Sequence, residues 1–279
     1  MMMLVLMALF VAVGYLVGGG GGMVIAFVIA AIMNFIAYWF SDKMVLSMYR
    51  AREVSEADHP RLYRVVRRVA AQAMLVNTPK VYIVPTRAPN AFATGRDADH
   101  AAVAVTEGLL ELLTEDELEG VIGHEISHVI NQDMLVGTIA ATFAGAVGIL
   151  ASMARWGAIF GGMSNRDNDR GGVIGLLVAA IVAPLVAMII QMAISRQREY
   201  KADAVGGRIT GKYLSLASAL EKLHTSPVRM NLDDRPATAH LMIANPLSGR
   251  NLTNLFSTHP PVEERIKRLR EMAQMPPHG

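Results

Sequence analysis

Two histidines and a glutamate are spaced so that they could bind and use a metal ion. The segment at residues 124–128 carries His124 and His128 at its ends, four residues apart. On a helix with 3.6 residues per turn, both imidazoles project from one face toward a single ion. Glu125 lies between them, where a carboxylate can take a proton from a metal-activated water and later deliver it to a leaving amine. The pattern predicts a zinc-dependent site that hydrolyses peptide bonds.

A catalytic zinc ion needs a third protein ligand and one position open for water. Glu199, which follows the last long apolar stretch, is the candidate ligand, and Asp203 lies one helical turn further on the same face. Asp203 could accept a hydrogen bond from a ligand histidine and fix its tautomer. The alternative is that both acidic residues are ordinary surface charges. Because the chain has no cysteine, any metal must be held by His and carboxylate side chains.

The composition favours an integral membrane protein. The 279-residue chain is 52% hydrophobic, and residues 1–41 contain no Asp, Glu, Lys or Arg. Because a bilayer core of ~30 Å needs roughly 20 apolar residues per helix, this stretch has room for two spans. The glycine run at 18–22 separates them into residues 3–17 and 23–40. A signal peptide is the alternative for the first span, although no basic residues precede it.

Two further uncharged stretches, residues 134–154 and 171–195, complete a prediction of four transmembrane helices. The alternative for this second pair is a buried helical hairpin in a soluble core. A pair of spans returns the chain to the side it left, so the two histidines and Glu199 can meet at the membrane surface. The predicted organisation is a membrane hairpin (1–41), a first catalytic part (42–133), a second membrane hairpin (134–195) and a second catalytic part (196–279).

Basic residues near the span ends predict that both catalytic parts face the cytoplasm. Short loops rich in Lys and Arg stay on the cytoplasmic side of a membrane. Such residues follow the second and fourth predicted spans: Lys43, Arg50, Arg52, Arg196, Arg198, Lys201, Arg208 and Lys212. The net charge is only +2, and no basic tract is interleaved with aromatic residues. Nucleic acid is therefore not an expected partner.

The first catalytic part is expected to combine helices with a small β-sheet, so the predicted fold class is α+β and mainly helical. Residues 60–73 have the pattern of a basic amphipathic helix, and the apolar segments 80–84 and 101–105 predict strands. Thr114, with Glu117 three residues later, predicts a capping box. That cap begins the helix that carries the histidine pair.

Four segments together resemble the HtpX-type membrane metallopeptidases, which are relatives of the CAAX prenyl proteases. They are the histidine motif, Glu199 with Asp203, the Asn-Ala-Phe-Ala-Thr-Gly run at 90–95, and the Ser-Thr-His-Pro-Pro run at 257–261 with Arg265. The resemblance implies a gluzincin-like catalytic domain, with one Zn²⁺ per subunit held by His124, His128 and Glu199. It also implies a role in degrading damaged or misassembled membrane proteins.

The resemblance gives two more segments expected roles. In similar enzymes, the residues that correspond to Asn90, Ala91 and Phe92 line the cleft beside an edge strand. A substrate that pairs there in extended form is held by its backbone, which gives low sequence selectivity. A connecting loop is the alternative for this segment. By resemblance, His259 could donate to the tetrahedral oxyanion; the alternative is a surface or packing histidine.

The predicted function is a zinc endopeptidase at the cytoplasmic face of a bacterial inner membrane. Its partners would be the lipid bilayer and misfolded membrane proteins or unfolded polypeptides. One alternative is a more selective processing peptidase that trims particular membrane proteins or lipid-modified peptides. Another is a membrane scaffold in which the histidine cluster is structural, and such a scaffold would not require a general base at Glu125.

Overall fold

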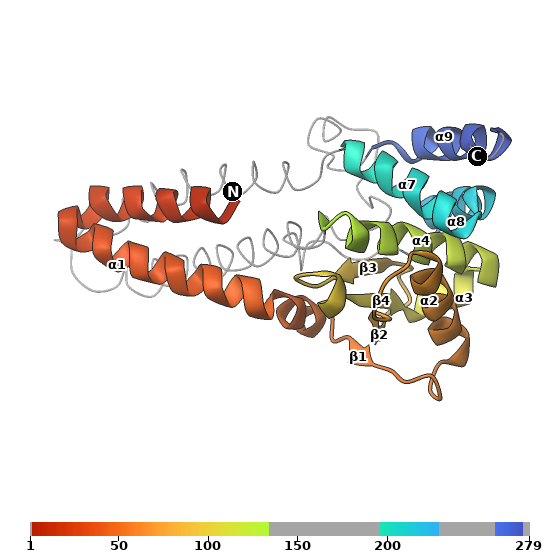
Figure 1. Ribbon diagram of the computed structural model, residues 1–279, viewed down its shortest axis with the longest axis horizontal. Helices are drawn as coiled ribbons and strands as arrows, with labels where there is room; N and C mark the ends of the chain where they lie inside the picture. Colours follow the sequence, from red (N-terminus) through yellow and green to blue (C-terminus); the bar gives the residue numbers. More distant parts are fainter. Residues whose placement is uncertain (1, 134–195, 229–259, 276–279) are drawn as a thin grey trace.

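The computed structural model describes residues 2–133, 196–228 and 260–275 and shows a mainly helical protein with one small mixed sheet (Figure 1). A long helical hairpin extends to one side of a unit in which helices pack on the sheet and on one another. The predicted spans at 134–154 and 171–195 lie outside the described residues, as does His259.

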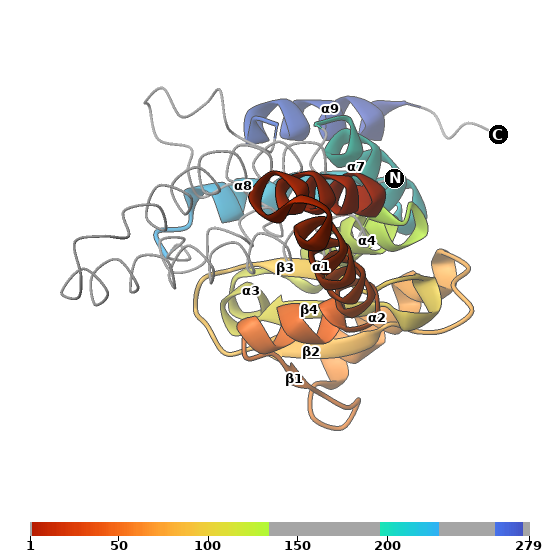
Figure 2. The same cartoon turned by 90° about the vertical axis from the view of Figure 1, so that its left-hand side faces the viewer.

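Helix α1 (Met2–Met48) reverses direction at the glycine run, so its two arms lie side by side (Figures 1 and 2). Gly19 has a φ of 56°, a conformation that costs glycine little. Gly14 and Gly22, on opposite arms, approach so closely that a Cβ on either would collide with the other's backbone. Further along the arms, the Asn34 side chain donates a hydrogen bond to the Met3 carbonyl at 3.2 Å.

Within the described residues, one helical stretch, Gly19–Phe40, is long and apolar enough to cross a membrane. It covers the second of the four predicted spans. Many of its large apolar side chains are exposed in the structure, as expected for a surface that faces lipid: Val24, Ile25, Phe27, Val28, Ile29, Ile32, Phe35 and Trp39. The first predicted span lies on the other arm of α1 and stays a prediction.

The sheet has four strands in the order β1-β2-β4-β3. They are β1 (Arg52–Glu53), β2 (Lys80–Val84), β3 (Ala91–Thr94) and β4 (Ala102–Thr106). The strand expected at 80–84 is confirmed, and the one expected at 101–105 is shifted by one residue. β2 and β4 run parallel, whereas β3 pairs antiparallel with β4 and forms an edge of the sheet. The segment at 90–95 is therefore an edge strand and its flanks, rather than a connecting loop.

Helix α2 (Pro60–Gln72) shows how amphipathic sequence becomes packing. Its buried residues Leu62, Val65, Val66 and Val69 follow the spacing of one helix face. They join a core that the sheet, α4 and the C-terminal helices share. Two further elements lie around the sheet: the 3₁₀ turn η1 (Ala98–His100) and α3 (Glu107–Leu112).

Helix α4 (Glu115–Ile130) is the centre of the helical layer. It packs against β3 and α2 on one side and against α7 (Arg196–Thr210) and α8 (Tyr213–Thr225) on the other (Figures 1 and 2). The last described helix, α9 (Val262–Gln274), packs on α8 and α7. Nearly every residue of α4 from its second turn onward is buried, so this helix is fixed in position by contacts on all sides.

The capping box predicted at the start of α4 is confirmed. Thr114 Oγ1 accepts the Glu117 N–H at 3.3 Å, and a Glu117 carboxylate oxygen accepts the Thr114 N–H at 2.8 Å. The same carboxylate accepts hydrogen bonds from Ser218 and Lys222 on α8, both at 2.7 Å. One side chain therefore caps α4 and joins it to α8.

We expect Glu117→Gln to lower the free energy of unfolding at neutral pH by about 1–3 kcal/mol, because a hydrogen-bonded charge is lost. Burial opposes ionisation of Glu117, but Lys222, Ser218 and the Thr114 N–H lower its pKa to about 2. The stabilisation is fully present above the ordinary glutamate pKa of 4.5, which applies to the unfolded chain, and is lost as pH falls through the folded value of about 2. Thermal unfolding at several pH values should show the parent and variant converging in acid.

The control is Glu115→Gln in the same helical turn, because the Glu115 side chain is 43% exposed. An exposed ion pair of this kind contributes about 0–1 kcal/mol. Equal melting temperatures for the parent and Glu117→Gln at neutral pH would show that the contact between α4 and α8 contributes nothing measurable.

Candidate metal centre

The crossing of α4 and α7 depends on two glycines that allow the backbones to touch. A Cβ at Gly206 would lie 2.6 Å from the His124 backbone nitrogen, and a Cβ at Gly123 would lie 2.9 Å from the Gly206 carbonyl oxygen. Real Cβ atoms do not approach backbone atoms so closely, so any side chain here would push the helices apart. The crossing point lies next to His124 on α4 and two turns beyond Glu199 on α7, which brings the two residues together.

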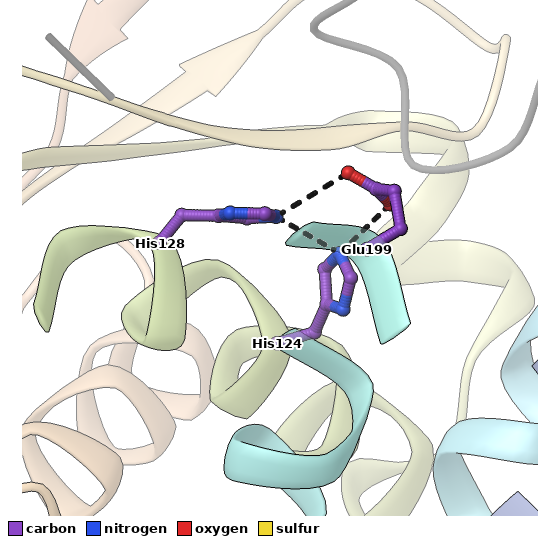
Figure 3. A group of neighbouring side chains, drawn as sticks. All are labelled: His124, His128 and Glu199. Carbon is purple, nitrogen blue, oxygen red and sulfur yellow. Dashed lines mark hydrogen bonds and ion pairs between the residues drawn. The ribbon is translucent and has the colours of Figure 1, made fainter. Parts of the chain in front are cut away.

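The three predicted ligands converge at this crossing (Figure 3). The Nε2 atoms of His124 and His128 are 3.3 Å apart. Glu199 Oε2 lies 3.6 Å from His124 Nε2, and Glu199 Oε1 lies 3.7 Å from His128 Nε2. Tetrahedral zinc with bonds of ~2.0–2.1 Å separates neighbouring ligand atoms by about 3.3 Å. The spacing of the nitrogen and oxygen atoms therefore fits a zinc ion.

His124 is held by Asp203, at the place the sequence predicted for it. Asp203 Oδ1 lies 2.9 Å from His124 Nδ1, and both side chains are almost fully buried. A proton on Nδ1 donated to this carboxylate leaves the Nε2 lone pair directed at the ligand cluster. Burial opposes ionisation of Asp203, but the charge and hydrogen bonds of Arg265 keep its pKa below its ordinary value.

His128 has a corresponding partner that the sequence analysis missed. Asp133 Oδ2 lies 3.3 Å from His128 Nδ1, and Arg198 Nε lies 3.6 Å from the other Asp133 oxygen. Burial would lower the pKa of His128, but the hydrogen bond to Asp133 and the charges of Glu199 and Glu125 raise it to about 9. The only sequence signal for Asp133 is an acidic residue shortly after the last helical turn.

Glu125 faces the edge strand. It is 5% exposed, and its Oε2 accepts the backbone N–H of Ala93 on β3 at 2.9 Å. Burial raises the pKa of Glu125, while the two neighbouring histidines oppose that rise. A carboxylate whose pKa is moved toward neutrality is suited to accept and return a proton.

The predicted substrate residues have buried side chains. Phe92 packs on the face of β3 opposite α4, with its ring 5.0 Å from that of Tyr49 at the inner end of α1. Asn90 donates its backbone N–H to Thr106 Oγ1 at 2.8 Å. Ala91 is fully buried in the main core. What this segment presents to Glu125 is the backbone of Ala93.

Arg265 is the most notable residue to which the sequence analysis gave no role. It reaches the site from α9 and is 1% exposed. Its Nε and one terminal nitrogen donate to the two oxygens of Asp203 at 2.8 and 2.7 Å, and the other terminal nitrogen lies 3.3 Å from Glu199 Oε2. Three carboxylates, those of Glu125, Glu199 and Asp203, therefore lie near one guanidinium. A cation bound among them would add to the balancing positive charge.

Two histidines on one helix, a glutamate from a second helix and a buried carboxylate facing an edge strand form an arrangement suited to a metal-dependent peptidase. The model of "Peptidase family M48" matches residues 56–273, and the chain therefore belongs to this family of metallopeptidases.

Relatives named "Protease HtpX homolog" resemble nearly the whole chain. The protein from Syntrophobacter fumaroxidans is 57% identical over 273 residues, covering 96% of this chain and 95% of the relative. That from Pyrococcus furiosus is 54% identical over 274 residues, covering 98% and 94%. The resemblance to HtpX-type metallopeptidases is thus confirmed.

A solved structure shares the fold. The crystal structure of S. mikatae Ste24p matches with a TM-score of 0.52 and 16% sequence identity. The match covers 95% of this chain, whereas the chain spans 62% of the length of Ste24p. The mainly helical architecture with a small sheet is therefore common to both proteins.

Proposed function

We propose that this metallopeptidase is a zinc-dependent endopeptidase that cleaves misfolded or damaged membrane proteins and other unfolded polypeptides. The observation that carries the proposal is the contact between Glu125 and the Ala93 N–H. Through this contact a buried carboxylate, next to His124 in the sequence, joins the edge of the sheet to the cluster of His124, His128 and Glu199, which supports the proposal. A purely structural histidine cluster would not require this carboxylate.

Each residue of the site has a part in the proposed chemistry. His124, His128 and Glu199 would hold the ion, which when bound activates a water molecule and polarises the scissile carbonyl. Glu125 would accept the proton of the attacking water and pass it to the nitrogen of the leaving amine. The Ala93 N–H keeps one oxygen of Glu125 in place for both transfers.

The proposed substrate site is the outer edge of β3. The Thr106 N–H bonds to the Asn90 carbonyl, and alternation along an antiparallel pair then turns the backbone groups of Ala91 and Ala93 away from β4. An extended substrate added at this edge would be held by main-chain hydrogen bonds. Such binding tolerates many side chains, which suits an enzyme that clears damaged proteins.

The proposed location is a bacterial inner membrane, with both catalytic parts in the cytoplasm. The stretch Gly19–Phe40 supports a membrane anchor. Lys43, Arg50 and Arg52 follow it directly, and basic residues at the end of a span favour the cytoplasmic side. The remaining predicted spans and the oxyanion role of His259 stay predictions.

The proposal is tested with the full chain purified in detergent and an unfolded, casein-like protein as substrate. We expect cleavage within the polypeptide, its loss on treatment with a chelator, and its return when one equivalent of zinc is added. If the protein cleaved the substrate equally well with and without the chelator, the metal mechanism would be rejected. An enzyme that ignores the unfolded protein but cleaves a defined lipid-modified peptide would instead be the selective processing peptidase.

A further inference from the structure

We propose that Arg265 is a positioning residue of the metal centre and that α9 is therefore part of the catalytic machinery. This inference rests on the proposed function, since it concerns the affinity and geometry of the same ligand cluster. Arg265 is among the largest fully buried side chains of the described residues, and it contacts His124 on α4 and both Glu199 and Asp203 on α7.

The first step of the argument is the orientation of His124. Arg265 occupies both oxygens of Asp203 in a forked, two-point contact at 2.8 and 2.7 Å. A carboxylate held at two points cannot rotate, so its Oδ1 stays 2.9 Å from His124 Nδ1. One guanidinium nitrogen also lies 3.4 Å from this Nδ1 atom and 3.5 Å from Nε2, so the arginine is in direct contact with the imidazole ring. The direction of His124 Nε2 is thereby fixed through Asp203.

The second step is the orientation of Glu199. Glu199 Oε2 lies between the guanidinium, at 3.3 Å, and His124 Nε2, at 3.6 Å. The arginine therefore forms an ion pair with the same Glu199 oxygen that lies nearest His124 Nε2, and this contact restrains the direction of the carboxylate. Because Glu199 and Asp203 are one turn apart on α7, one planar guanidinium can align both.

The charge of Arg265 and the geometry of its contacts are expected to have opposite effects on zinc affinity, so the variant must change one and keep the other. Removing the positive charge would leave a more negative cluster that attracts a divalent ion, while losing the fork would loosen the ligands. Arg265→Lys keeps the charge but replaces the planar fork by a single ammonium group. This substitution tests positioning alone. Arg270→Lys on the same helix is the matched control, because the Arg270 side chain is 56% exposed.

The experiment measures zinc affinity by chelator competition, the visible absorption of the Co²⁺-loaded protein, and melting temperatures with and without metal. We expect Arg265→Lys to bind zinc about 10–100-fold more weakly, the range seen when residues that orient metal ligands are changed. The Co²⁺ bands should shift, and the stabilisation gained on zinc binding should shrink. Arg270→Lys should match the parent in all three measurements.

Asp203→Asn is the second variant, because it weakens the contact with Arg265 from the other side, and it can be measured even if Arg265→Lys does not fold. If Arg265 acts largely through Asp203, a variant that carries both substitutions should bind zinc about as weakly as Asp203→Asn alone. If Arg265 were merely structural, Arg265→Lys would lower the melting temperatures of metal-free and metal-loaded protein equally and leave zinc affinity and the Co²⁺ spectrum unchanged. That result would overturn this inference but not the proposed function. A parent protein that binds no zinc would overturn the proposed function as well.

Discussion

Replacing Glu125 by Gln is expected to reduce kcat for cleavage of an unfolded protein by about 10²–10⁴-fold, the usual contribution of a general base. Zinc content should stay near one ion per chain, because Glu125 is not among the three clustered ligand atoms. The amide oxygen of Gln can still accept the Ala93 N–H that Glu125 accepts at 2.9 Å. The loss should therefore lie in proton transfer and not in the position of β3.

The measurement is single-turnover cleavage together with metal analysis of the same preparations. Glu115→Gln is the control, since it makes the same chemical change at a partly exposed position of the same helix. Its activity should equal that of the parent. If Glu125→Gln retained full activity with one zinc ion bound, the assignment of the base would be wrong.

Replacing Glu199 by Ala is expected to weaken zinc binding by at least about 100-fold, since it removes a proposed ligand, whereas losing an outer partner alone costs 10–100-fold. The reason is geometric: both Glu199 oxygens lie within 3.7 Å of an imidazole Nε2, and two histidines alone leave the ion with half of a tetrahedral shell. Activity should fall with the metal and recover partly in excess zinc.

Zinc affinity of the purified variant is measured against Glu221→Ala, an exposed glutamate on α8 with a side chain 60% accessible. Zinc affinity equal to that of the parent would assign the third ligand to another residue. Glu125→Gln and Glu199→Ala are expected to differ, because Glu125→Gln should keep the zinc ion and lose cleavage, whereas Glu199→Ala should lose the zinc ion first.

The parts of the fold that local rules determine could be predicted from the sequence. Strand β2 and helix α2 lie where strand propensity and amphipathic spacing placed them, and the capping box at Thr114 is present. The clustering of His124 and His128 follows from helical spacing alone. Their meeting with Glu199 could be anticipated only by requiring a third ligand on the same side of the membrane.

Other parts could not be predicted because nothing local distinguishes them. Arg265 stands among charged neighbours on an amphipathic helix, and its sequence environment is that of an exposed arginine, yet it is fully buried. Asp133 reaches His128 through the turn that ends α4, which spacing does not specify. Phe92 belongs to the segment expected to line the cleft, but strand alternation directs its ring to the other face of the sheet.

Through the ring of Phe92, helix α1 also supports the edge strand of the sheet. Val45, Leu46 and Tyr49, at the inner end of α1, form one cluster with Phe92, Ala102 and Ala104 on the back of the sheet. The strand whose Ala93 N–H bonds to Glu125 is thus packed from behind against the end of α1. A transmembrane helix adapts to the thickness of its bilayer partly by tilting, and a tilt of α1 would act on the edge strand β3 through this cluster. A fragment that lacks α1 would expose the apolar back of the sheet, including Phe92, and β3 would lose this packing support.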